Sequence, residues 1–422
     1  MTPLQKLRTI TLLFALSGVV GCTAPSAMDA VSTTDGSRAR PAPTTGDEIE
    51  AALLVKADAS ANWLISPVSI EQAFGLAQLG ATGATADQIS AVVGIEQGQA
   101  GAAAMAERRA MLTDAGPGVT IAIENALWLA QGWSFRPAFV AGAQRHYGAA
   151  VQTLDFRGNP SASAAAINAW AASKTRGLIG DFVQPSSINP DTAAVLTNAT
   201  YFRARWATSF AQVERGQFRA GNAAPIDLDM VRDRRRVRYR ETPHYQAARI
   251  RYGDSEADSG GERFAMEVYL PRPGVSLDAM RVAILGTGLE TTSQELNAAR
   301  ETTVDLALPE FEISFTTDLR KAMEAIGLTL PFDRARAEFG GMTATPVYID
   351  QAVHTTRLRV DREGTEAAAV TSLVPMPVSA PPPFNGPVMR VDRPFLLVIR
   401  DARTGSWLFT GMIVRPTPLK GR

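Results

Sequence analysis

Apolar residues recur at helical spacing in the first part of the chain. Ile70, Phe74 and Ala77 follow Ser69 at intervals of three and four residues, and this pattern predicts a helix. The segment 85–88 (TADQ) has the form of a capping box, which predicts the start of a second helix. Two further helices are predicted over 135–147 and 162–175, and strands over 119–129 and 151–156.

After residue 190 the pattern changes to that of strands. The long apolar run 192–206 is typical of a strand that is buried on both faces. One helix, 317–326, is predicted among further strands at 226–230, 236–240, 246–252, 264–270, 304–315, 347–360, 388–391, 395–400 and 407–414. Helices first and strands later, without βαβ alternation, predict an α+β fold. No repeat and no linker interrupts the chain after residue 47, so we expect one domain over 47–418.

Composition narrows the class of protein. Of the 422 residues 45% are hydrophobic, which is enough for a large core. The 42 basic and 42 acidic residues balance, whereas a dedicated nucleic-acid binder usually carries a basic excess. A single cysteine excludes an intramolecular disulfide, and three histidines without metal-binding spacing argue against zinc. We therefore expect no metal, no cofactor and no nucleic-acid partner.

The first residues have the pattern of an export signal. Lys6 and Arg8 precede an apolar stretch, 10–20, that is too short for a mature membrane span. The stretch ends in Val-Val-Gly before Cys22, which resembles the lipobox of bacterial lipoproteins. The alternative is an ordinary cleaved signal with an incidental cysteine. The prediction is a signal peptide (1–21) and a lipidated flexible tether (22–46) that anchors the protein to the cell envelope.

The sorting rule of Gram-negative lipoproteins sharpens that prediction of location. Residue 23 is Thr rather than Asp, which by that rule directs a lipoprotein to the outer membrane or cell surface. We expect contact with the membrane only through the lipid on Cys22.

Motifs for catalysis are missing from the sequence. The segment 253–257 (GDSEA) fails the G-x-S-x-G pattern at its last position, and no Gly-Lys-Ser/Thr occurs. Six arginines between 232 and 240 are a candidate polyanion site, but Val237 and Tyr239 alternate with them as on a strand with one solvated face. We favour the solvated strand, and we do not expect an enzyme.

Residues 363–387 are unusual, because six prolines lie between 375 and 387 inside the domain. A low-complexity linker is the alternative, but long loops without structure of their own within a domain are usually functional. If this loop were extended, small and apolar side chains would share one face from Thr365 to Leu373. Such a segment can slide between two existing strands.

Eight motifs in order resemble those of one family, the serpins. They are 62–70 (NWLISPVSI), 79–85 (LGATGAT), 196–202 (LTNATYF) with Trp206, 308–311 (LPEF) with Asp318 and Leu319, His354, 363–369 (EGTEAAA), 393–395 (RPF) and 408–411 (LFTG). The resemblance covers 47–418. It implies three β-sheets, about nine helices and an exposed reactive-centre loop.

The resemblance also implies a function, the inhibition of a serine protease by a suicide-substrate mechanism. The protease attacks the loop as a substrate and forms an acyl-enzyme, and the freed loop inserts into the main sheet and traps it covalently. We expect a monomer that is consumed one molecule per protease. A non-inhibitory serpin, acting as a surface binding or structural module, is the alternative, although small hinge residues argue against it.

Roles follow residue by residue from the resemblance. Counting fourteen residues from Gly364 places the scissile bond at Val378–Ser379, which suits an elastase-like protease, with a chymotrypsin-like protease as the alternative. Trp206 matches the tryptophan of the breach, where the loop enters the sheet. The hinge comprises Gly364, Thr365, Glu366, Ala367, Ala368, Ala369 and Val370, and the polar shutter cluster comprises Ser66, Ser69, Asn198 and His354.

Two residue choices depart from the family. Arg362 stands where serpins commonly have Glu, and Glu310 where they commonly have Lys, so we hypothesise a charge-swapped pair. Pro375 has no N–H and would lose a ladder bond if it inserted centrally. It is expected to slow insertion and to make the protein more substrate-like.

Overall fold

The computed structural model describes residues 46–177, 179–188, 191–221, 223–253, 263–365 and 384–419. All of these residues fall within one compact unit, 42–422. The predicted signal peptide, Cys22 and the tether up to residue 45 lie outside the described residues, as do Glu366–Val370, Pro375, Val378 and Ser379. The first helix, α1 (Gly46–Lys56), begins one residue before the expected start of the domain.

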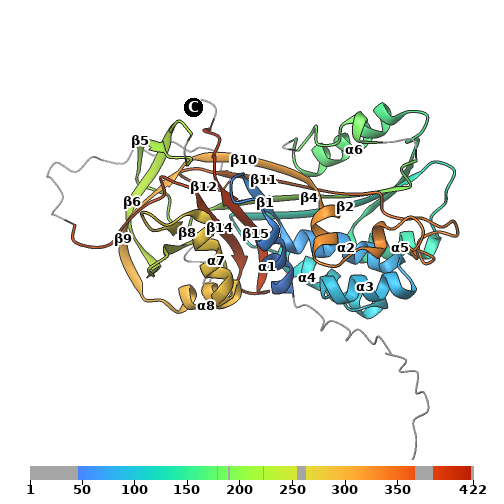
Figure 1. Ribbon diagram of the computed structural model, residues 1–422, viewed down its shortest axis with the longest axis horizontal. Helices are drawn as coiled ribbons and strands as arrows, with labels where there is room; N and C mark the ends of the chain where they lie inside the picture. Colours follow the sequence, from blue (N-terminus) through green and yellow to red (C-terminus); the bar gives the residue numbers. More distant parts are fainter. Residues whose placement is uncertain are drawn as a thin grey trace, which may run out of the picture. The chain divides into compact units, whose positions relative to one another are not determined.

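Helices cover both faces of a six-stranded sheet (Figure 1). On one face lie α2 (Pro67–Gly80), α3 (Gly83–Val93), α4 (Gly98–Thr113) and α5 (Pro137–Tyr147), and on the other lies α6 (Pro160–Lys174). Helix α2 is the central one, since every residue except Leu79 is buried. Pro67 occupies its first turn, where no intrahelical bond needs its missing N–H.

The six-stranded sheet has the order β10-β11-β12-β4-β2-β3. Its central strands, β4 (Ala194–Arg205) and β11 (Gln351–Val360), are parallel neighbours, and β12 (Gly364–Thr365) lies between them at one end. The outer strands are β2 (Val119–Ala130), β3 (Ala150–Leu154) and β10 (Phe311–Asp318). Strand β4 is buried along almost its whole length, as its apolar run predicts.

The remaining strands form a nine-stranded sheet. One part of it contains β1 (Trp63–Ile65), β15 (Ser406–Ile413), β14 (Phe395–Asp401), β8 (Phe264–Pro271) and β7 (Tyr245–Arg251). The other contains β6 (Ile226–Glu241), β9 (Glu301–Pro309), β13 (Val388–Arg390) and β5 (Gln212–Phe218). Among the described residues, the two parts are joined only where β6 pairs with β7 over Arg238–Glu241. The three sheets that the resemblance implies are therefore linked by hydrogen bonds into two.

The described residues confirm the α+β class and contain nine α-helices. The largest core fills the space between the two sheets, where Ile121, Phe202 and Leu358 of one meet Leu228 and Val268 of the other.

The prediction of a lone late helix is wrong, because α7 (Leu277–Thr287) and α8 (Leu289–Ala298) precede α9 (Leu319–Ala325) among the strands. The predicted strand 304–315 is two strands, β9 and β10, separated at Glu310, while the two predicted at 226–230 and 236–240 are the single strand β6. The 3-10 turns are Pro185–Ser187 and Leu330–Phe332.

Candidate functional site

The candidate site is the junction between β4 and β11, which is closed at one end and already holds β12 at the other. The two strands pair directly where Gln351–Thr356 run beside Val195–Thr200. Beyond that stretch β12 intervenes, with Thr365 paired to Val360 on one side and to Ala204 on the other. The sheet thus already contains the first residues of an additional antiparallel strand.

Gly364 begins this short strand, and the packing there leaves no room for a side chain. A Cβ atom at this position would lie 2.1 Å from the carbonyl oxygen of Ala204. The chain reaches Gly364 through a tight turn in which Asp361 N donates to Gly364 O at 2.8 Å. The buried Asp361 carboxylate accepts from the amides of Glu363 and Gly364. The predicted pivot glycine therefore packs directly against the backbone of β4 at Ala204 and Arg205.

Trp206 fixes this turn from the side of β4. Its indole N–H donates to Asp361 O at 2.9 Å, and its backbone N–H donates to Glu363 O at 2.9 Å. The ring stacks on Tyr252 with 4.5 Å between centroids, and the Tyr252 hydroxyl lies 2.6 Å from Thr365 Oγ1. Burial raises the pKa of Tyr252, so the phenol stays neutral and can donate to the threonine. Both residues of the pair thus contact the base of the loop, although only Trp206 was predicted from the sequence.

The predicted shutter residues come together beneath the closed part of the junction. Ser69 Oγ donates to Asn198 Oδ1 at 2.7 Å, and the Asn198 amide donates to Ser69 O at 3.1 Å and to Asn125 Oδ1 at 2.8 Å. Thr200 donates to Ser69 Oγ. All of these residues are buried, so the hydrogen bonds tie helix α2 to strands β2 and β4 in the protein interior.

His354 links this cluster to β11. Its Nδ1 lies 2.7 Å from Asn198 Oδ1, which can only accept, and its Nε2 accepts from Ser66 N at 3.1 Å. These two contacts require the neutral ring with the proton on Nδ1. Complete burial lowers the pKa of His354 to about 3, which keeps the ring neutral at physiological pH.

Sequence reasoning missed Asn125, Thr200, Tyr252 and Asp361. Asn125 and Thr200 are polar residues within apolar strand runs, and that contrast is the signal that could have marked them. Tyr252 and Asp361 gave no such signal, because their partners are backbone groups or residues distant in the sequence.

The structure brings Arg362 and Glu310 into contact, while the printed ion pair of the Arg362 guanidinium is with Glu363, at 3.9 Å. The contact runs through the backbone, where Arg362 N donates to Glu310 Oε1 at 2.8 Å. The Arg362 guanidinium donates to Phe210 O at 2.8 Å, and Phe210 N donates back to Arg362 O at 3.1 Å. Glu310 is buried, so its carboxylate holds the loop base as an acceptor.

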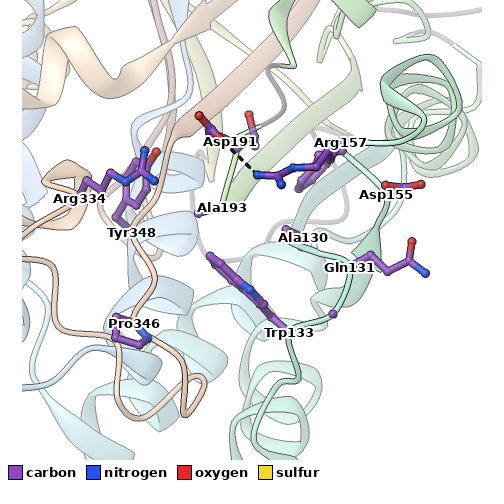
Figure 2. A pocket seen from close by; sticks show the side chains of 13 residues that line it. Ala130, Gln131, Trp133, Asp155, Arg157, Asp191, Ala193, Arg334, Pro346 and Tyr348 are labelled. Atoms are coloured by element: carbon purple, nitrogen blue, oxygen red, sulfur yellow. Dashed lines mark hydrogen bonds and ion pairs between the residues drawn. The ribbon is translucent and has the colours of Figure 1, made fainter.

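A cavity of about 690 Å³ lies at the opposite end of the junction, below the first residues of β4 and β11 (Figure 2). Asp191, Thr192 and Ala193 line it from the β4 side, and Pro346 and Tyr348 line it from the β11 side. Figure 2 shows Trp133 and Tyr348 on facing walls. Arg157 and Asp191 form an ion pair whose N and O atoms lie 3.1 Å apart.

The described residues contain neither a candidate metal site nor a candidate membrane-spanning helix. No group of three or more His, Cys, Asp or Glu residues in that part of the chain could hold a metal ion. Within the same residues, no helix combines the length and the apolar character that crossing a membrane would need.

Comparisons with known proteins agree on one family. The family model for serpins, described as serine protease inhibitors, matches residues 51–416. Putative serpin-Z8 of Oryza sativa subsp. japonica is 31% identical over 84% of this chain and 91% of its own length. Iripin-2 of Ixodes ricinus is 28% identical over 83% of this chain and 87% of its own length.

Solved structures show the same fold. A structure of the Arabidopsis serpin AtSerpin1 in its native stressed conformation matches with a TM-score of 0.75, at 23% identity, over 88% of this chain and 96% of that one. Human thyroxine-binding globulin, solved in complex with thyroxine, matches with a TM-score of 0.74, at 24% identity, over 88% and 97%. With this fold and a family model that spans nearly all of the described residues, the chain belongs to the serpin family.

Proposed function

We propose that the protein inhibits a serine protease by inserting its cleaved loop between β4 and β11. Serpins are generally serine protease inhibitors, and the observation that carries the proposal for this chain is the position of β12. Two residues of the loop are already hydrogen-bonded into the sheet, and the next residue is the first that could extend the strand. Insertion would lengthen both ladders and bury further side chains.

The register of β12 predicts where each inserted residue would lie. Continuing antiparallel from the Thr365–Ala204 pair, Ala367 would lie opposite Phe202, and Ala369 opposite Thr200. Phe202 faces the core between the sheets, and Thr200 faces the shutter cluster. Only small side chains would fit beside them. The alanines at 367 and 369 thus match the space that the sheet offers.

The charge of Glu366 also matches the path that the inserted strand would follow. The same register would place it between Arg203 of β4 and Arg359 of β11, on the face away from the core. An acidic residue entering between two arginines gains favourable electrostatic energy as the first step of insertion. The only acidic side chain within 365–378 would therefore meet the one arginine pair that flanks the path.

Insertion would also rearrange the shutter cluster. Asn198 and His354 are direct partners across the closed part of the junction, and Thr371 would come to lie between them. The Asn198–His354 hydrogen bond must break for this, and the Thr371 hydroxyl can donate and accept in its place. The native contact therefore delays insertion until cleavage frees the loop.

The length of the loop would bring its cleaved end to the cavity below the junction. The extended register would bring Val378 level with Asp191, which lines that cavity. We propose Val378–Ser379 as the scissile bond and an elastase-like enzyme as the target, because Val suits a small apolar specificity pocket. A chymotrypsin-like target is the alternative. Pro375 and Pro377 would then lie near the end of the path, where few ladder bonds remain to be lost.

The test is a covalent adduct with pancreatic elastase. We expect a complex that survives SDS, with mass spectrometry of the released peptide showing cleavage after Val378. The Ala369→Arg variant should be cleaved without forming the adduct, because the arginine would have to enter the core, while Ala369→Ser should keep the adduct. Cleavage of the unsubstituted protein without any adduct would contradict the proposal.

A non-inhibitory binding module is the second candidate function. The prolines of the loop favour it, since they oppose strand formation, and thyroxine-binding globulin shows that this fold also occurs in a complex with a small molecule. A comparison of the melting temperatures of the cleaved and the intact protein distinguishes the two candidate functions. A rise of tens of degrees after cleavage indicates insertion, and an unchanged value indicates a binding module.

We further propose that the protein is exported and anchored to the cell envelope by lipid on Cys22. The support is the motif before this cysteine, the only one in the chain. Metabolic labelling with a palmitate analogue tests it. Labelling that persists in Cys22→Ser would contradict the proposal.

A further inference from the structure

The cavity below the junction of β4 and β11 combines two aromatic walls with a charged rim (Figure 2). Trp133 follows β2, Tyr348 precedes β11, and both side chains are half-buried. Pro346 adds a third apolar surface. The volume of about 690 Å³ falls within the range of small-molecule sites, about 300–1,000 Å³. The cavity therefore has room for a ligand of more than one ring.

One of the aromatic walls is held in place by a hydrogen bond. The Tyr348 hydroxyl is bonded to Asp350, whose carboxylate also accepts from Thr192 Oγ1 at 2.9 Å. Burial and then the charge of Asp350 raise the pKa of Tyr348, so the phenol stays neutral and can donate. The ring is therefore ordered before a ligand arrives, which lowers the entropic cost of binding.

The lining of the cavity carries equal numbers of acidic and basic side chains. Arg157 and Asp191 pair with each other at 3.1 Å. Asp155 and Arg334 are exposed, and the Arg334 guanidinium lies 6.0 Å from the centroid of the Tyr348 ring. Because two acids and two arginines balance, the lining favours neither an anion nor a cation.

The polar groups of the rim also limit what an uncharged ligand can be. Water solvates the exposed charges, and a ligand that displaces this water must replace its hydrogen bonds, which a purely apolar molecule cannot do. A carboxylate only accepts and a guanidinium only donates, whereas a hydroxyl group does both without carrying a charge. The matching ligand is uncharged, with apolar faces for the two aromatic rings and hydroxyls along its edges.

We propose that this cavity binds a neutral oligosaccharide. The C–H faces of the sugar rings would pack against Trp133 and Tyr348, because an aromatic ring offers a large apolar surface. The hydroxyls would donate to Asp155 and accept from Arg334 at the rim, and hydrogen bonds to charged groups are stronger than those between neutral groups. The aromatic walls thus supply the apolar contact, and the rim supplies the orientation.

A saccharide in this cavity would connect the two sides of the junction. Trp133 follows β2, which is paired with β4, and Tyr348 leads into β11. The two sides meet where Asp350 N donates to Ala194 O at 3.0 Å. A ligand held between the two rings would therefore resist the separation of β4 and β11. This consequence rests on the proposed function for its importance, whereas binding of the saccharide does not.

Calorimetric titration of the full-length protein with cellotriose and with maltotriose tests the site. At least one of the two trisaccharides should bind saturably, with one molecule per protein. Adenosine, which is uncharged but has an aromatic base, should bind at least tenfold more weakly than that trisaccharide. Failure of both trisaccharides to bind, or equally tight binding of adenosine, would overturn the proposal.

Substitutions in the wall and at the rim locate the bound trisaccharide. Trp133→Ala should weaken its binding about tenfold or more, and Trp133→Phe should restore most of the affinity because a ring remains. Arg334→Gln should weaken binding about fivefold or more, since it removes a charged donor. Arg336→Gln removes a nearby exposed arginine that does not line the cavity, and should change binding less than about twofold. Unchanged binding in Trp133→Ala, or equal losses in the two arginine variants, would overturn the site.

Hydrogen exchange tests the effect on the junction without any protease. The bound trisaccharide should slow the exchange of the Asp350 amide, which donates to Ala194 O, and leave the Val268 amide in β8 unchanged. Binding without slower exchange at Asp350 would refute the effect on the junction and leave the saccharide site itself intact.

Discussion

His354 Nδ1 donates to Asn198 Oδ1 across 2.7 Å, at the point where β11 and β4 are paired directly. Asn198 also bonds to Ser69 in helix α2, and His354 accepts from the backbone N–H of Ser66, the N-cap residue of that helix. One contact therefore joins the two strands that the proposed insertion would separate and the helix beneath them.

Asn198→Ala should destabilise the native protein by about 3 kcal/mol, because it leaves several buried partners unsatisfied. The measurement is the midpoint of the first unfolding transition in urea. Asn297→Ala, on the exposed surface of α8, should change stability by less than about 0.5 kcal/mol. Comparable losses in the two variants would show that the network contributes little.

Native stability should fall as the pH drops below about 6.5. His354 has its pKa lowered to about 3 in the folded protein, whereas an unfolded histidine titrates near 6.5, so the unfolded state binds the extra proton. The contribution of neutral His354 to the free energy of unfolding is fully present above pH 6.5 and is lost progressively toward pH 3. The loss between pH 7.5 and 5 is about 2 kcal/mol. Urea midpoints at both pH values measure it. His354→Gln should show a smaller loss, and an identical pH dependence would contradict this assignment.

Gly364→Ala should destabilise the native form by more than about 1 kcal/mol, because the new Cβ would meet the Ala204 carbonyl. We expect β12 to leave the sheet, which faster hydrogen exchange at Thr365 and Trp206 would report. Gly180→Ala, where no heavy atom lies within 4 Å of the added Cβ, is the control. Unchanged exchange in Gly364→Ala would mean that the strand can shift to make room.

Glu310→Leu should be less stable than Glu310→Gln by about 2 kcal/mol. The glutamine keeps an acceptor for the Arg362 amide, whereas leucine leaves this partly buried N–H without a partner. Equal stabilities would contradict the role of the Glu310 oxygen.

A double-mutant cycle with Arg362→Glu and Glu310→Arg tests the charge-swap hypothesis separately. Coupling above about 0.5 kcal/mol supports an interaction between the side-chain charges. Zero coupling would contradict the hypothesis of a charge pair. It would not bear on the hydrogen bond from the backbone amide of Arg362.

Much of the fold followed from local pattern. The apolar run 192–206 predicted β4, and the spacing of Ile70, Phe74 and Ala77 predicted α2. Helix α4 was missed because it is rich in alanine and glycine and has no continuous apolar stripe. Strand β6 was divided in the prediction because charged residues occupy its middle. Local patterns report burial, and they fail where a segment is held by polar or backbone contacts.

Eight ordered motifs identified the family and singled out Ser66, Ser69, Asn198, His354 and Trp206. How these residues act became visible only in the fold. The fold sets the proton on His354 Nδ1, makes the Ala204 carbonyl the reason for glycine at 364, and gathers arginines of β6 and β7 around a cavity. Hydrogen-bond direction, steric exclusion and local charge depend on distances between residues far apart in the chain, and periodicity along one strand does not encode those distances.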